Sequence, residues 1–133
     1  MIENEALEYD DNHLWTLDGV PFSGFAFEID EESGWRTETE YKNGLEDGTS
    51  LTFDTEGVLR ERAEYYRGAL HGSRRRWNGS GELVSETIAE YGYLVTRRRL
   101  GDDGTMQVVY SIQSNPSQLE LLELARRRHE EDA

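Results

Sequence analysis

Hydrophobic and polar residues alternate one by one along several short segments of the chain. In residues 35–42 (WRTETEYK), aromatic and Thr side chains alternate with charged ones, and residues 25–30, 48–53 and 104–112 show a similar alternation. A period of two is typical of a β-strand that has one half-buried face and one solvated face. The pattern therefore predicts a mainly β protein built from short strands.

Segments rich in Gly, Asn and Asp separate these strands. They read LDG, EESG, KNG, DTEG, YRG and NGSG, and they recur about every ten to twelve residues. Asn, Asp and Gly supply the positive φ angles of tight hairpin turns. We therefore expect a single antiparallel meander of about eight short strands over residues 19–112.

The segment 41–57 returns as the segment 65–81, after 24 residues and without a gap. The matched positions are Gly44, Gly48, Phe53, Gly57 and Leu59 with Gly68, Gly72, Trp77, Gly81 and Leu83. A slightly slipped copy spans residues 19–34, and an eroded copy follows Gly92. We expect the repeated glycines to form turns, and each repeated aromatic residue to pack against the neighbouring hairpin.

The C-terminal part of the chain has a helical pattern instead. Asn115 is suited to the N-cap and Pro116 to the first helical position, and leucines recur from residue 119 to residue 124. We predict one helix over residues 115–129, with a fraying tail over residues 129–133 (HEEDA). The helix can cover an end or a face of the sheet, or its leucines can dock on a partner.

The repeat resembles the variant MORN repeats of the YwqK-type antitoxin family. The likeness lies in the spacing Y-x-x-G-x-x-x-G, the aromatic residue five positions later, the closing G-x-L and the opening G-V-P-F-S-G, and it covers about residues 19–100. The resemblance implies a β-hairpin array that acts as a binding surface, in a bacterial antitoxin or immunity protein. We expect one domain over residues 1–133, with residues 1–18 as a lead-in.

The chain carries a net charge of −14, and this excess lies in its first half. Residues 1–64 contain 18 acidic and 4 basic side chains, whereas residues 65–133 contain 10 of each. Such a field favours a basic protein partner and disfavours nucleic acid and anionic membranes, although solubility alone also explains it. The acidic N-terminus and the absence of a long apolar run or any cysteine predict a soluble, cytoplasmic protein.

Catalytic patterns are not evident. His13, His71 and His129 are expected before the first hairpin, in a turn and in the fraying tail, away from any nucleophile motif. The acidic runs 30–32 and 102–103 can hold a stray divalent ion but do not follow a Ca²⁺-binding pattern. We therefore expect no enzymatic activity, no cofactor and no metal site.

Two arginine runs, Arg74–Arg76 and Arg97–Arg99, fall on successive outgoing strands. Cross-strand pairing with Glu82, Glu86 and Glu90 explains them, and a basic stripe for RNA or DNA is the alternative.

These observations predict an immunity protein or antitoxin that binds a cognate toxin stoichiometrically. A toxin acting on nucleic acid has a basic active-site cleft, to which an acidic surface is complementary. The predicted partner-binding residues are Asp30, Glu31, Glu32, Trp35, Glu46 and Asp47. Trp35 is either the anchor of that interface or a residue packed on the sheet. The alternative function is a scaffolding repeat protein without a toxin partner.

Overall fold

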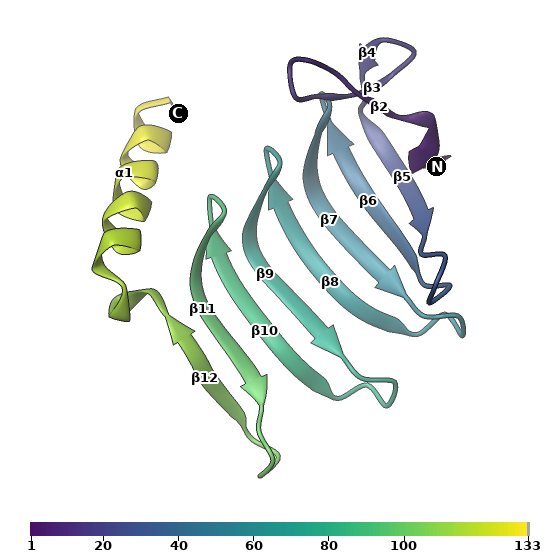
Figure 1. Cartoon of the computed structure of the whole chain (residues 1–133). Helices are drawn as coiled ribbons and strands as arrows, with labels where there is room; N and C mark the ends of the chain where they lie inside the picture. Colours follow the sequence, from purple (N-terminus) through teal and green to yellow (C-terminus); the bar gives the residue numbers. More distant parts are fainter. Residues whose placement is uncertain (133) are drawn as a thin grey trace.

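The computed structural model describes residues 1–132, which form a long single-layer sheet with a small lobe at one end and a helix at the other (Figure 1). The nine-stranded main sheet has the order β1-β5-β6-β7-β8-β9-β10-β11-β12. Its antiparallel strands are β5 (Gly24–Ile29), β6 (Arg36–Lys42), β7 (Leu45–Phe53), β8 (Leu59–Tyr66), β9 (Ala69–Trp77), β10 (Leu83–Glu90), β11 (Tyr93–Leu100) and β12 (Met106–Ser111). The predicted eight-stranded meander is confirmed.

Two-residue turns close the hairpins at one end of the sheet. The pairs Asn43-Gly44, Arg67-Gly68 and Tyr91-Gly92 all have positive φ angles at both residues. This is the turn geometry that matches the twist of the paired strands, and it explains why Gly returns at these places. At the other end, side-chain oxygens of Asp54 and Asn78 accept hydrogen bonds from backbone N–H groups two and four residues later.

Gly48 and Gly72 are not turn residues, and their prediction as such was wrong. They lie inside β7 and β9 with φ angles of 106° and 118°. A Cβ atom at Gly48 would overlap the carboxylate of Glu40 on β6, and one at Gly72 would lie 2.8 Å from a carboxylate oxygen of Glu64. Glycine is required here by a close approach between neighbouring strands as well as by its φ angle.

The N-terminal residues form a lobe on one face of the main sheet. Strand β1 (Ile2–Glu3) pairs in parallel with β5, and a 3-10 turn η1 (Asn4–Ala6) follows. Strands β2 (Glu8–Tyr9), β3 (Trp15–Leu17) and β4 (Val20–Pro21) form a separate three-stranded sheet. The lead-in expected over residues 1–18 thus contributes a ninth strand to the main sheet. We call residues 1–22 the N-terminal lobe, and the side of the main sheet that it covers the lobed face.

A small core fixes the lobe to the sheet. Leu7, Ala26 and Tyr41 are buried together. Backbone hydrogen bonds join Trp15 and Phe22 of the lobe to Gly44 in the β6–β7 turn. Because the sheet has a single layer, its hydrophobic core lies only where a second element covers it.

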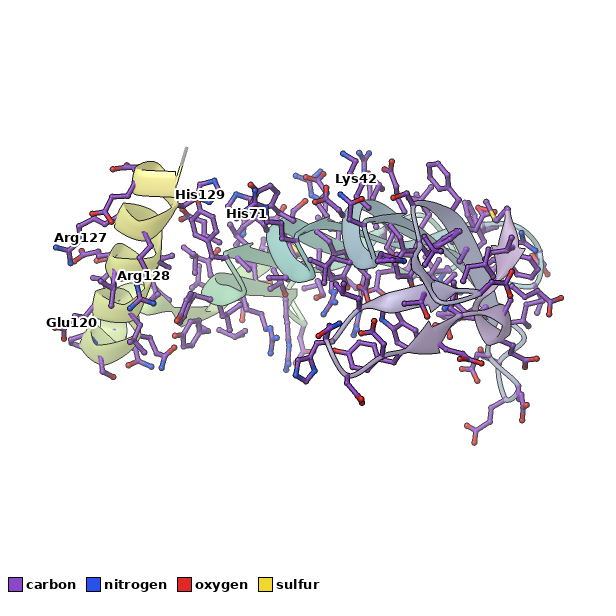
Figure 2. The ribbon with its side chains drawn as sticks, turned by 90° about the horizontal axis from the view of Figure 1, so that it is seen from above. Lys42, His71, Glu120, Arg127, Arg128 and His129 are labelled. Atoms are coloured by element: carbon purple, nitrogen blue, oxygen red, sulfur yellow. The ribbon has the colours of Figure 1, made fainter. Side chains whose placement is uncertain are left out.

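Helix α1 (Pro116–Asp132) follows a 3-10 turn η2 (Ile112–Ser114) and stands across the β12 end of the sheet (Figures 1 and 2). Asn115 accepts the first helical hydrogen bond from Leu119 N, at 3.0 Å, as its predicted N-cap position requires. The helix continues to Asp132, three residues beyond its predicted end at His129, and the last residue of the predicted fraying tail lies outside the described residues. The imidazole of His129 packs against the rings of Tyr66 and Tyr91, which holds this end of the helix.

Leu122 is completely buried and Arg126 forms a two-contact ion pair with Glu90 on β10, at 3.0 and 2.5 Å. The helix therefore covers the end of the sheet, the first of its two predicted roles. Leu121 and Leu124 remain exposed.

Candidate functional site

The predicted partner-binding residues lie in two groups at opposite ends of β6. Asp30, Glu31 and Glu32 are exposed in the β5–β6 turn, next to Arg36, whereas Glu46 on β7 pairs with Tyr41. Five residues of extended strand separate these ends by about 17 Å. The two groups therefore do not form one compact rim.

Two of the predicted carboxylates are engaged within the protein. Asp30 accepts hydrogen bonds from Glu32 N and from the Ser33 hydroxyl, at 3.1 and 3.0 Å. Asp47 accepts one from Arg67 N at 3.2 Å and lies 3.7 Å from Lys42 Nζ. Both carboxylates thus stabilise turns, and Glu31, Glu32 and Glu46 are more available to a partner.

Trp35 is half-buried, and the guanidinium of Arg60 stacks on its ring with the guanidinium carbon 4.5 Å from the ring centroid. Arg60 is held in turn by the carbonyl of Trp77 and by Asp54, at 3.0 and 3.3 Å. One side of the indole is therefore occupied by a fixed cation. This arrangement fits packing within the sheet better than a free anchor for a partner.

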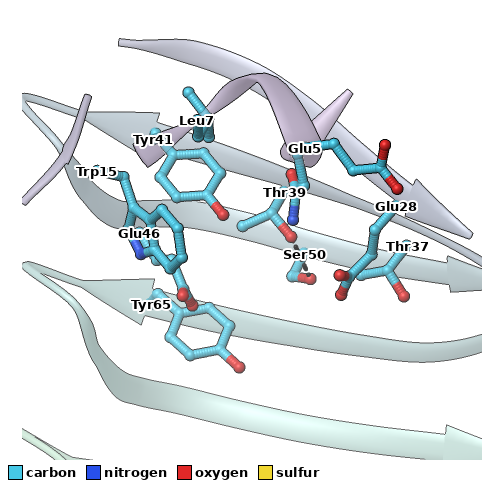
Figure 3. Close-up of a pocket in the computed structure, with 11 residues that line it drawn as sticks. Glu5, Leu7, Trp15, Glu28, Thr37, Thr39, Tyr41, Glu46, Ser50 and Tyr65 are labelled. Atoms are coloured by element: carbon cyan, nitrogen blue, oxygen red, sulfur yellow. Dashed lines mark hydrogen bonds between the residues drawn. The ribbon is translucent and has the colours of Figure 1, made fainter. Parts of the chain in front are cut away.

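A cavity of about 440 Å³ lies on the lobed face between the N-terminal lobe and strands β5 to β8 (Figure 3). Three aromatic side chains, two strand carboxylates and several hydroxyl groups line it. The lining residues are Asn4, Glu5, Leu7, Trp15, Glu28, Thr37, Thr39, Tyr41, Glu46, Ser50 and Tyr65. No Lys, Arg or His belongs to this lining, as far as residues 1–132 show.

In the cavity, burial and a neighbouring carboxylate affect the pKa of Glu46 more strongly than the nearby guanidinium of Arg74 does. Burial raises the pKa of Glu46, and the neighbouring carboxylate of Glu28 raises it further, while Arg74 acts weakly in the opposite direction. Burial, followed by the charges of Glu46 and Glu28, raises the pKa of Tyr41 to about 12. A further negative charge is thus disfavoured in the cavity, and a positively charged group is favoured.

A second hollow, of about 450 Å³, continues the first toward the β5–β6 turn and shares Asn4, Glu5 and Glu28 with it. Because of these shared residues, Asp30 and Glu31 of the turn and Glu46 of β7 belong to one continuous surface, whereas the predicted acids Glu32 and Asp47 line neither hollow. We call it the acidic surface, and its carboxylates are Glu3, Glu5, Glu28, Asp30, Glu31 and Glu46.

Three of these carboxylates, Glu3, Glu5 and Glu28, were absent from the sequence-based prediction. Glu3 and Glu5 reach the site because β1 pairs in parallel with β5 across more than 20 residues of sequence. No local pattern in the first residues indicates that pairing. The alternation in residues 25–30 does place Glu28 opposite the apolar side chains of its strand, but does not say that a lobe covers that face.

The arginine runs divide between the two faces of the sheet. Glu86, with its side chain 8% exposed, pairs with Arg75 and Arg98 on the two neighbouring strands, as predicted. The other two predicted acids have different partners: Glu90 pairs with Arg126 of the helix, and Glu82 accepts from the Asn78 amide. The cross-strand prediction thus holds for one of the three glutamates.

The histidines take part in ring packing rather than in a catalytic arrangement. His13 lies against Tyr9, and the Nδ1 atom of His71 accepts a hydrogen bond from Tyr91 N at 3.0 Å. Within residues 1–132 no three His, Asp or Glu side chains are placed to ligate a metal ion. No helix in this part of the chain has the length and apolar character needed to span a membrane.

No protein-family model, characterised protein or solved structure matches this chain.

Proposed function

We propose that this chain is a cytoplasmic immunity protein or antitoxin with MORN-like repeats, which neutralises a cognate toxin by stoichiometric binding through its acidic surface. The toxin has a basic active-site cleft of the kind that binds nucleic acid. The resemblance of the repeats supports the class of protein. The observation that carries the proposal is the cavity that holds Glu28 and Glu46 without a cation in its lining.

A basic side chain of the partner fits this cavity chemically. An arginine or lysine head group would neutralise the pair of carboxylates, whose mutual repulsion contributes to the raised pKa of Glu46. The rings of Trp15, Tyr41 and Tyr65 add favourable contacts for a cation. The exposed acids of the turn, at the edge of the interface, would mainly accelerate association.

The test uses the purified product of the gene adjacent to this one. It measures inhibition of that product's toxicity, the stoichiometry, and the association and dissociation rates at low and moderate salt. The variant carries Glu28→Gln and Glu46→Gln, and a matched control carries Glu56→Gln and Glu120→Gln, two exposed acids outside the acidic surface. We expect one-to-one inhibition by the parent and the control. For the cavity variant we expect dissociation of the complex at least about tenfold faster, and a weaker salt dependence of the affinity.

Equal rates for the variant and the parent at both salt levels would show that the acidic surface only aids solubility. An adjacent gene product that is not toxic, or that does not bind, would remove the toxin from the proposal.

A scaffolding role is the second candidate, and the position of β12 as the last strand of the main sheet favours it. Val108 and Val109 on this strand are 64% and 52% exposed, and residues 105–111 carry no charge. An open, uncharged edge allows strand addition by another chain. In that case the parent would bind a protein partner without changing any toxic activity, and the Glu28→Gln, Glu46→Gln variant would bind it equally well.

A further inference from the structure

Four arginines form a patch on the lobed face, beyond the cavity. Arg74 and Arg76 lie on β9, and Arg97 and Arg99 on β11. Strand β10 lies between these two strands. In the strand register, Thr87 pairs with both Arg74 and Arg97, and Ser85 pairs with both Arg76 and Arg99. We call these four residues the arginine patch.

The register places the patch on the same face as the cavity. One row of paired residues runs from Thr39 and Ser50, which line the cavity, through Ala63 to Arg74 and on to Arg97. Paired residues of an antiparallel sheet point to the same side. The face is therefore acidic at its β5–β7 end and basic over β9–β11.

The positive charge of the patch is only partly compensated. Glu61 lies 3.1 Å from Arg74 Nε and 3.4 Å from Arg76 Nε. The Nε of Arg74 is nevertheless buried without an aligned hydrogen bond, while its Nη2 donates to the Tyr65 hydroxyl at 2.8 Å. Among residues 1–132, no carboxylate comes within 4.0 Å of Arg97 or Arg99.

The opposite face of the same strands shows that compensation is possible. There Glu86 pairs with both Arg75 and Arg98, so the central arginine of each run is neutralised. Of the four outer arginines, Arg74 and Arg76 share the single carboxylate of Glu61. A chain with a net charge of −14 thus keeps an excess of positive charge at one place on its surface.

We propose that the arginine patch binds an acidic peptide segment of a protein partner in extended conformation. Alternate residues of an extended chain repeat at about 7 Å, and Arg74 and Arg76, like Arg97 and Arg99, have this same spacing along their strands. The two arginine pairs are two strands apart, about 10 Å. Carboxylates on alternate residues of the peptide therefore match one pair of guanidinium groups, each of which can bind a carboxylate through two hydrogen bonds.

A peptide fits this face better than a nucleic acid does. The acidic cavity begins at β7 and β8, within about 10 Å of Arg74, so a long polyanion crossing the face would meet Glu46 and Glu28. The net charge of the chain repels a polyanion as well. A short acidic segment confined to β9–β11 avoids this repulsion. The proposal does not depend on the toxin-binding function.

The test is an NMR titration that follows the backbone amides and the arginine Nε–Hε signals. The probe is a capped peptide of about eight residues in which Thr and Glu alternate, and the same peptide with Gln for Glu is the uncharged comparison. We expect the acidic peptide to shift the signals of Arg74, Arg76, Arg97 and Arg99 and the amides of β9–β11. The shifts should decline with added salt.

The variant for this test carries Arg97→Gln and Arg99→Gln. Its matched control carries Arg62→Gln, on the opposite face, and Arg127→Gln, which points away from the sheet on the helix (Figure 2). Both double variants lose two positive charges. We expect at least about a tenfold loss of peptide affinity for the patch variant and less than about a twofold loss for the control.

Three results would overturn the proposal. The first is an absence of shifts at Arg97 and Arg99 when the acidic peptide is added. The second is an equal loss of affinity in the control, which would indicate attraction by overall charge only. The third is tighter binding of a short oligothymidylate at the same signals, which would assign the patch to nucleic acid.

Discussion

Replacing Leu122 by Ala measures how much the helix contributes to the stability of the sheet. Leu122 is fully buried on α1, and with Ile112 it is one of the two largest fully buried side chains of residues 1–132. Removing a buried leucine side chain to Cβ destabilises a protein by about 3 kcal/mol, through lost apolar burial and the cavity left behind. Leu121, which is 43% exposed on the same helix, provides the matched control.

The corresponding change in melting temperature follows from the size of the chain. With an unfolding entropy of about 2.1 cal/mol/K per residue, 133 residues give about 0.28 kcal/mol/K, so 3 kcal/mol lowers the Tm by about 11 °C. We expect Leu121→Ala to change the free energy of unfolding by less than about 1 kcal/mol. Urea titrations followed by circular dichroism, together with thermal scans, give both quantities.

A loss of less than about 1 kcal/mol for Leu122→Ala would refute the assignment of the helix as a cover of the sheet end. Equal losses for Leu121→Ala and Leu122→Ala would also contradict it. Hydrogen exchange would detect a third outcome, in which only the amides of the helix lose protection. That result would mean that the helix undocks while the sheet stays folded.

Three further predictions concern single residues of the sheet. Gly48→Ala should destabilise the protein by about 1 to 3 kcal/mol, because Gly48 has a positive φ angle and an added Cβ would overlap the carboxylate of Glu40. Gly57→Ala, at a turn with open space around it, should cause a smaller loss of stability. Equal urea midpoints for the two variants would contradict this prediction. Burial raises the pKa of Glu46, so the stabilising contribution of this side chain is present at low pH and is lost as the pH rises through that pKa. Glu46→Gln should therefore raise the free energy of unfolding at neutral pH but not in acid. Urea titrations at several pH values measure this difference. The hydrogen bond from Arg98 lowers the pKa of Glu86, so the stabilising contribution of Glu86 is present at neutral pH and is lost as the pH falls through the folded-state pKa. Glu86→Gln should lower the free energy of unfolding at neutral pH and reduce the loss of stability on acidification. An unchanged loss of stability on acidification would contradict this prediction.

The candidate site shows how much of its composition local sequence patterns could predict. The acidic turn at residues 30–32 and the acids 46 and 47 were visible as charged positions in the sequence. Their separation at opposite ends of β6 follows from the strand length. Their connection through Glu28 and the lobe depends on pairing between distant segments, and the engagement of Asp30 and Asp47 in turns depends on hydrogen bonds with backbone N–H groups.

The sequence by itself determined the meander strands of the main sheet, their hairpin turns and the helix, but not the strands of the N-terminal lobe. Alternation with a period of two, positive-φ residues at two-residue turns and an N-cap followed by proline are local preferences, and they decide strands, hairpins and the start of α1 within a few neighbouring residues. Only the tertiary structure decided which carboxylates share a cavity, why Gly48 must be glycine, and which arginines remain without an acidic partner. These features depend on register and on parallel pairing across the chain. A shift of one residue moves every side chain of a strand to the other face, so the charges of each face were not defined until the strands were paired.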